Sequence, residues 1–262
     1  MKIFKKYFVL IIWMGCLFGY SFYGFSTSVF IIVIIPLSII LRPFKNFHRE
    51  FLDFTLHSYL AFLTRVLLPI TQVYKIKEIS GFERIPKDIN AVYVANHQGK
   101  LDGPLILGIL KNTSAVMKIK YASILIYSTL VKHLDFVSVD QYSRKSIEKS
   151  YFLARRLILR GKNLLVFPEG TRSISGRLLP FNNFAFKLAH DANVWIIPII
   201  IYSNGSFMSK KISSYFPQKQ ITYCIRCLSP VKPLESDSPS DTAEKVRKIM
   251  YNELKKSKII NI

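Results

Sequence analysis

The chain has 262 residues, half of them hydrophobic and a fifth charged, and its net charge is +21. This length suits one sizeable domain with an appendage, and the mean hydropathy of +0.24 is higher than we expect of a purely soluble domain. Nucleic acid, an anionic membrane surface and phosphorylated substrates all attract such a charge. Because the basic residues are scattered and follow a hydrophobic N-terminus, we predict no nucleic-acid partner and favour the other two.

Residues 7–41 contain no charged side chain, and basic residues lie on both sides of this run. As one straight helix the run would span roughly 50 Å, whereas the hydrocarbon core of a bilayer is about 30 Å thick. The glycines and hydroxyl residues of 19–28 predict a break. We therefore expect 1–41 to be a hydrophobic membrane anchor, built as a hairpin or a tight pair of helices, with both basic ends facing the cytoplasm.

Residues 42–74 are rich in Phe, Leu and Tyr, with charged residues and histidines interspersed. This pattern predicts a helical segment at the membrane interface. A plain amphipathic core helix has the same pattern, and the sequence does not separate the two.

From residue 75 to residue 262 the pattern changes to alternating strands and helices. Apolar, β-branched runs predict strands at 73–79, 91–95, 115–117, 136–139, 164–167, 194–201 and 221–227. Helices are predicted at 104–110, 123–132, 144–160, 184–189 and 242–255, the last capped by Ser240 or Asp241. The alternation indicates an α/β fold with a mixed, largely parallel sheet flanked by helices.

Cysteine usage gives little support for a metal or redox site. Cys16 lies in the apolar N-terminal run, and Cys224 and Cys227 form a single C-x-x-C without a second ligand pair. We predict ordinary buried strand cysteines and no metal site.

Polar residues follow several of the predicted strands. His97, Lys118 and Glu169 each come after the carboxyl end of a strand, and ligand sites in open α/β sheets gather at that edge. A turn that leads into a helix near Leu101 would bring Asp102 back onto the His97 imidazole, although a spacing of five does not share one helix face. In such a pair the carboxylate orients the imidazole, as it does in a hydrolytic triad, but the serine nucleophile is missing. A substrate hydroxyl would then be the nucleophile; the alternative is a histidine buried in a turn.

A second motif, F-P-E-G-T-R-S, occupies 167–173. Gly170 permits close approach of the backbone, and Arg172 carries a planar fork suited to phosphate. Glu169 can accept hydrogen bonds from hydroxyls beside that phosphate, and Lys118 supplies a further cation.

Together these motifs resemble the glycerolipid acyltransferase family, typified by 1-acylglycerol-3-phosphate acyltransferase, over roughly residues 75–230. The family's H-x4-D block matches His97 and Asp102, its F-P-E-G-T-R-S block is complete, and 196–199 is similar to its hydrophobic–Pro–hydrophobic block. The resemblance implies that His97 is the general base and that Asp102 orients it. It also implies a substrate-binding set for phosphate and glycerol, which we assign to Lys118, Glu169, Gly170, Thr171 and Arg172.

Two positions depart from the family pattern. Gln141 stands where an arginine is expected, with Arg144 three residues on as a substitute, and Phe184 replaces a glycine and would narrow the space there. Both departures concern the acceptor more than the reaction class.

We therefore expect an enzyme at the cytoplasmic face of a membrane that needs no cofactor. It would move a fatty acyl group from a thioester, on coenzyme A or acyl carrier protein, to the hydroxyl of 1-acylglycerol 3-phosphate, which gives phosphatidic acid. One alternative is the same chemistry on another lysolipid or on glycerol 3-phosphate. The other is a non-catalytic membrane protein that binds anionic lipids.

Overall fold

A seven-stranded sheet forms the centre of the molecule. The structure, a computed structural model, describes residues 2–41, 43–86, 89–124, 128 and 134–259. In chain order the strands are β1 (Tyr74–Ser80), β2 (Ala91–Ala95), β3 (Thr113–Lys118), β4 (Val137–Val139), β5 (Asn163–Val166), β6 (Trp195–Ser203) and β7 (Ile221–Cys227). Their spatial order is β1-β7-β6-β2-β5-β3-β4, and every neighbouring pair is parallel except β6 and β7. The predicted mixed, largely parallel sheet is confirmed.

Strand direction decides where loops meet. Because β7 is antiparallel to β6 and parallel to β1, strands β2 to β6 run one way and β1 and β7 run the other. The carboxyl ends of β2 to β6 therefore share one edge of the sheet.

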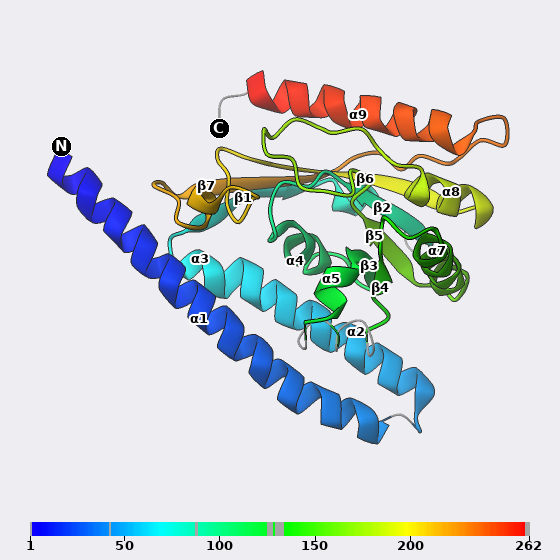
Figure 1. The fold of residues 1–262 in the computed structure, drawn as a ribbon, viewed down its shortest axis with the longest axis horizontal. Coiled ribbons are helices and arrows are strands. Elements are labelled where there is room, and N and C mark those ends of the chain that lie inside the picture. The colour runs from blue at the N-terminus through cyan, green and yellow to red at the C-terminus, as the bar shows by residue number, and fades with distance from the viewer. Residues whose placement is uncertain (1, 42, 87–88, 125–127, 129–133, 260–262) are drawn as a thin grey trace.

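Helices cover both faces of the sheet (Figure 1). The first face packs against α1 (Lys2–Leu41), α2 (Lys45–Phe62) and α4 (Asp102–Leu107), and the second against α7 (Arg144–Leu159), α8 (Phe184–Asp191) and α9 (Pro239–Ile259). Strand β2 is buried throughout because alternate side chains enter opposite cores: Tyr93 faces the first helix layer, and Val92 and Val94 face the second.

The N-terminal apolar run is a single helix, so the predicted break at 19–28 is wrong. Helix α1 runs without interruption from Lys2 to Leu41, and the chain turns back before α2, so that the two helices lie side by side in opposite directions (Figure 1). A helix pair therefore exists, but its turn lies just beyond residue 41.

The residues that suggested a break serve helix packing instead. The Thr27 hydroxyl donates to the Tyr23 carbonyl one turn earlier (2.6 Å) and lies 2.8 Å from the Tyr59 hydroxyl of α2. Just before this stretch, Gly15 lets α1 approach the following helical segment closely, because a Cβ there would lie 2.1 Å from the Thr71 carbonyl oxygen. Thr27 and Gly15 thus hold α1 against its neighbours.

Residues 45–70 are helical, as the sequence predicts for 42–74. Helix α2 continues into a π-helical turn, η1 (Leu63–Leu67), and a last short turn, α3 (Leu68–Ile70). Buried leucines line the inward face: Leu52, Leu56, Leu60 and Leu63. Large apolar side chains remain exposed on the outward face: Phe47, Phe54, Phe62 and Ile70. Two stretches of the described chain, Tyr7–Leu41 and Glu50–Ile70, are long and apolar enough to cross a membrane.

Most of the other predicted elements are present within two or three residues of their predicted bounds. The cap of α9 is a correction: Ser238 Oγ accepts from the Asp241 amide (3.1 Å), and Asp241 Oδ2 accepts from the Ser238 amide (3.0 Å). This reciprocal capping box starts the helix at Pro239 rather than after Ser240 or Asp241. The helix predicted at 123–132 falls mostly outside the described residues; only α5 (Ile119–Ala122) precedes it. Cys224 and Cys227 are buried thiols of β7, as predicted.

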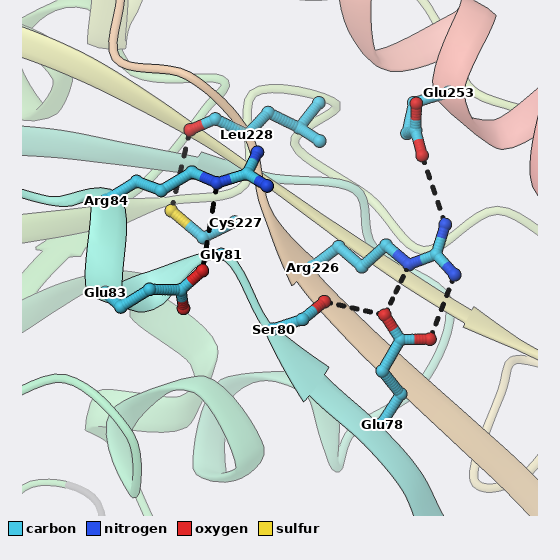
Figure 2. A pocket seen from close by; sticks show the side chains of 9 residues that line it. All are labelled: Glu78, Ser80, Gly81, Glu83, Arg84, Arg226, Cys227, Leu228 and Glu253. Atoms are coloured by element: carbon cyan, nitrogen blue, oxygen red, sulfur yellow. Dashed lines mark hydrogen bonds and ion pairs between the residues drawn. The ribbon is translucent and has the colours of Figure 1, made fainter.

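A polar cavity of about 310 Å³ lies at the opposite edge of the sheet, where β1 and β7 end (Figure 2). Arg226 makes a bidentate pair with Glu78 (2.7 and 2.9 Å) and contacts Glu253 of α9 (3.2 Å). Hydrogen bonds from Arg226 lower the pKa of Glu78 to about 2. Because these charges neutralise one another, we interpret the cluster as an ion-pair network that holds α9 against the sheet.

Candidate active site

The sequence-predicted residues come together at the carboxyl edge of β2 to β6. His97 follows β2, Lys118 ends β3, and residues 167–173 follow β5. A fourth segment, 204–216, follows β6 and includes the short helix η3 (Ile212–Tyr215). The parallel order β6-β2-β5-β3 makes these loops neighbours.

His97 and Asp102 form a hydrogen-bonded pair. The His97 Nδ1 atom lies 2.9 Å from Asp102 Oδ2; the Asp102 side chain is 1% exposed and the imidazole 22% exposed. With Nδ1–H donating to the carboxylate, Nε2 is the ring nitrogen that can accept a proton. The predicted fold-back is confirmed: helix α4 begins at Asp102, and the Asp102 carboxylate contacts the His97 ring.

The backbone of the intervening turn fixes the carboxylate. Asp102 Oδ2 also accepts hydrogen bonds from the Gln98 amide (2.6 Å) and the Gly99 amide (2.8 Å). Gly99 is required at this point, because a Cβ would lie 2.4 Å from the Phe207 carbonyl oxygen. Three donors directed at one oxygen fix the Asp102 side chain in the position where it orients the imidazole.

An aromatic ring packs against one face of the imidazole. Phe167 stacks on His97 with ring centroids 4.2 Å apart and planes 24° apart. We did not assign a site role to Phe167 from the sequence. The sequence feature that indicates such a role is its position: Phe167 directly follows β5, which pairs with the strand that leads to His97.

Glu169 joins the two motifs. Its Oε1 accepts from the His97 amide (2.8 Å) and its Oε2 from the Leu179 amide (3.0 Å), while the Ser173 amide donates to the His97 carbonyl (2.8 Å). Burial raises the pKa of Glu169 to about 7, although the hydrogen bonds from His97 and Leu179 oppose that shift. Its two oxygens thus hold backbone groups, and the predicted contact with a substrate hydroxyl stays a prediction.

Replacing Glu169 with glutamine should flatten the pH dependence of stability. The folded-state pKa of about 7 exceeds the ordinary 4.5, so the folded state binds the proton more tightly and the free energy of unfolding falls as pH rises between these values. Glutamine does not titrate, so this pH dependence should disappear. The glutamine NH₂ group would face a backbone N–H that donates to Glu169 in the wild type, so the variant should be less stable than the wild type at low pH. Melting temperatures at about pH 5 and about pH 8 measure both effects.

The control for this change is Glu244→Gln, because the Glu244 side chain on α9 is 70% exposed. This variant should keep the pH dependence of the wild type. An identical pH dependence in Glu169→Gln would contradict the assignment.

The rest of the second motif forms a tight turn. Gly170 has a φ of +61°, which favours glycine, and its amide donates to the Phe167 carbonyl (3.0 Å). The Asn182 amide donates to the Pro168 carbonyl from outside the turn (2.9 Å). Thr171 lies half-buried in the same turn.

Arg172 is held by the segment that follows β6. Its Nη1 atom donates to the Met208 and Ser209 carbonyls (2.8 and 2.9 Å). Burial raises the pKa of the Tyr215 hydroxyl, but hydrogen bonds to Lys100 and Arg172 outweigh it, and the pKa lies below its usual value. The Lys100 ammonium lies 5.2 Å from the Tyr215 ring centroid. We found no sequence signal for these contacts with 204–216.

Several cations gather at the site. Burial lowers the pKa of Lys118, and nearby Lys120, Lys210 and Arg172 lower it further. Within the described part of the chain, none of these cations, nor Lys100, makes an ion pair with a carboxylate. In contrast to the cluster of Figure 2, these cations remain available for an anion such as phosphate.

The two departures from the family pattern lie differently in the structure. Gln141 is exposed just beyond β4, whose last residue, Val139, pairs with Lys118. Arg144 points away as a surface residue, 95% exposed and paired with Glu148. The expected narrowing by Phe184 is wrong, because its ring packs edge-on against Tyr151 of α7 in the second core.

Comparison with known proteins agrees with these motifs. A family model described as Acyltransferase matches residues 77–202. The chain is 31% identical to 1-acyl-sn-glycerol-3-phosphate acyltransferase alpha of Homo sapiens over 195 residues, which cover 72% of this chain and 67% of that protein. It is 29% identical to a chloroplastic 1-acyl-sn-glycerol-3-phosphate acyltransferase of Brassica napus over 186 residues, 71% of this chain and 52% of that protein.

The crystal structure of the 1-acyl-sn-glycerophosphate (LPA) acyltransferase PlsC from Thermotoga maritima shares the fold. The TM-score is 0.74 at 22% identity, and the match covers 97% of this chain and 98% of that one. The aligned regions span about half to two thirds of the curated relatives' own lengths. The family match and the 31% identity to the human protein lead to one conclusion: the chain belongs to the glycerolipid acyltransferase family of the 1-acyl-sn-glycerol-3-phosphate acyltransferases.

Proposed function

We propose that the protein moves a fatty acyl group from an acyl thioester to the free hydroxyl of 1-acylglycerol 3-phosphate, which gives phosphatidic acid. The observation that carries this proposal is the oriented His97–Asp102 pair beside a cluster of cations. A base without an enzyme nucleophile suits a substrate hydroxyl, and the cations suit a phosphate on the same substrate.

In the proposed reaction, His97 Nε2 accepts the hydroxyl proton as the oxygen attacks the thioester carbonyl. The carbon–sulfur bond breaks as the new ester forms, and the departing thiolate takes the proton from the imidazolium. Asp102 stabilises the imidazolium, and Phe167 restricts the tilt of its ring. Arg172 and Lys118 hold the phosphate, so that the hydroxyl stays close to Nε2. The reaction needs a thioester donor, on coenzyme A or acyl carrier protein, and no cofactor.

We also propose that α1 and α2 seat the protein in one leaflet on the cytoplasmic side of a membrane. One face of α1 is buried against the protein from Ile12 to Thr27, so lipid does not surround this stretch. The other face exposes large apolar side chains, among them Leu17, Phe18 and Phe25. Basic residues flank both ends of the apolar run.

An acceptor panel tests the proposed function. Purified protein in liposomes would receive one acyl thioester and, in turn, 1-acylglycerol 3-phosphate, lysophospholipids with larger headgroups, glycerol 3-phosphate and monoacylglycerol. We expect the highest kcat/KM for 1-acylglycerol 3-phosphate. Faster transfer to another acceptor would overturn the acceptor assignment, and liposome binding without any transfer would favour the lipid-binding alternative.

Replacing Arg172 with alanine should raise the acceptor KM roughly 10- to 100-fold, because hydrogen bonds to charged groups are lost. The donor KM should change little. Initial rates with each substrate varied in turn measure both constants. Arg177→Ala is the matched control, since Arg177 is an exposed arginine of the same loop. An unchanged acceptor KM in Arg172→Ala would remove this residue from the phosphate site.

A further inference from the structure

The apolar helix α1 contacts the segment that holds Arg172. The Tyr20 hydroxyl donates to the Tyr215 carbonyl. The Tyr20 ring stacks on Phe207 (centroids 6.4 Å apart, planes 10° apart) and meets Phe216 edge-on (5.9 Å, 89°). One side chain of the predicted membrane anchor thus touches both ends of 207–216.

This segment is a compact unit. The Ser209 amide and hydroxyl each lie 2.9 Å from the Ser214 hydroxyl, and the Met208 amide donates to the Ser214 carbonyl (3.2 Å). Because these bonds close the segment on itself, a displacement at Tyr215 carries over to the carbonyls of Met208 and Ser209.

The same unit contacts the anion site at several points. The Met208 carbonyl accepts from Arg172 and from the Lys100 amide (3.0 Å), and Ser209 provides a second carbonyl for Arg172. The Tyr215 ring lies 5.2 Å from the Lys100 ammonium, and its phenol is close enough to Lys100 and Arg172 for both cations to lower its pKa. Tyr20 therefore reaches Arg172 through two connected contacts, one at each end of the unit.

We infer that Tyr20 is a positioning residue for the phosphate-binding Arg172, so that the N-terminal apolar helix is a structural part of the acceptor site as well as an anchor. The inference rests on the proposed function. Tyr20 does not touch the reacting atoms; it fixes the segment whose carbonyls and phenol hold the guanidinium. A change at Tyr20 should therefore affect acceptor binding and leave donor binding and the chemical step nearly unchanged.

The test is Tyr20→Phe, which keeps the ring and removes only the hydroxyl. Tyr7→Phe makes the same change on the same helix at a tyrosine that is 63% exposed. Losing one buried hydrogen bond should raise the acceptor KM about 5- to 10-fold, with donor KM and kcat within about twofold. The Tyr7 variant should match the wild type. An unchanged acceptor KM, or an equal rise in both KM values, would overturn the inference.

Two further measurements separate positioning from general destabilisation. In an Arg172→Ala background, Tyr20→Phe should raise the acceptor KM no further, whereas independent effects would multiply. Binding to vesicles that contain 1-acylglycerol 3-phosphate should weaken in Tyr20→Phe, and this readout needs no turnover. If the wild type binds this lipid without acyl transfer, the proposed function fails while the inference is still tested. If it shows no preference for the phosphorylated lipid, both fail.

Discussion

Replacing His97 with asparagine should lower kcat by about 10²- to 10⁴-fold, the usual worth of general-base catalysis. Asparagine keeps the backbone amide that donates to Glu169 but has no nitrogen that can accept the hydroxyl proton. Membrane association should be unchanged, because α1 and α2 are untouched. Initial rates of acyl transfer in liposomes, with both substrates saturating, measure the effect.

The matched control is His190→Asn. His190 lies in α8, where its Nε2 atom is 2.8 Å from the Thr242 hydroxyl, on the second face of the sheet. Its replacement should leave kcat unchanged even if the melting temperature falls. Substantial activity in folded His97→Asn would rule out the general-base role.

Replacing Asp102 with asparagine should also lower kcat by several orders of magnitude; the equivalent change in a serine-protease triad costs about 10⁴-fold. The amide loses the charge that holds the Nδ1–H tautomer and stabilises the imidazolium. It also weakens the hydrogen bonds from Gln98 and Gly99, each worth about 1.5–3 kcal/mol when the acceptor is charged. Melting temperature and kcat together separate loss of catalysis from loss of fold.

The two residues act as a unit, and a double variant tests this. If Asp102 works only through His97, the double variant should be no slower than His97→Asn alone. Multiplied effects would show that Asp102 contributes by another route.

The sequence predicts the architecture of the site well, because strand ends dictate it. Alternating strands and helices imply a parallel sheet, and parallel strands bring their carboxyl ends to one edge. This placement alone puts His97, Lys118 and Glu169 at that edge. The turn from His97 to Asp102 can also be predicted from the sequence, because Gly99 and Gly103 flank the point where a helix starts.

Local sequence misleads where long-range packing decides the outcome. The glycines and hydroxyls of 19–28 resemble a break, yet α1 continues through them and the Thr27 hydroxyl lies 2.8 Å from the Tyr59 hydroxyl of α2. The replacement of a family glycine by Phe184 predicts a narrower space, whereas the Phe184 ring packs against Tyr151 in the second core.

The contacts of the segment after β6 cannot be predicted from the sequence, for a different reason. The segment carries no motif, and its contacts with Arg172 run through the Met208 and Ser209 carbonyls, which any residue type supplies. Only the fold shows that 204–216 contacts Arg172 and Lys100.

The most direct test of the account is the product formed by the purified protein. Liposomes containing the wild type would receive an acyl thioester with a labelled acyl chain and 1-acylglycerol 3-phosphate, and lipids would be identified by mass spectrometry. We predict labelled phosphatidic acid from the wild type and at least about 100-fold less from His97→Asn. Folded, membrane-bound wild-type protein that forms no labelled phosphatidic acid would contradict the account.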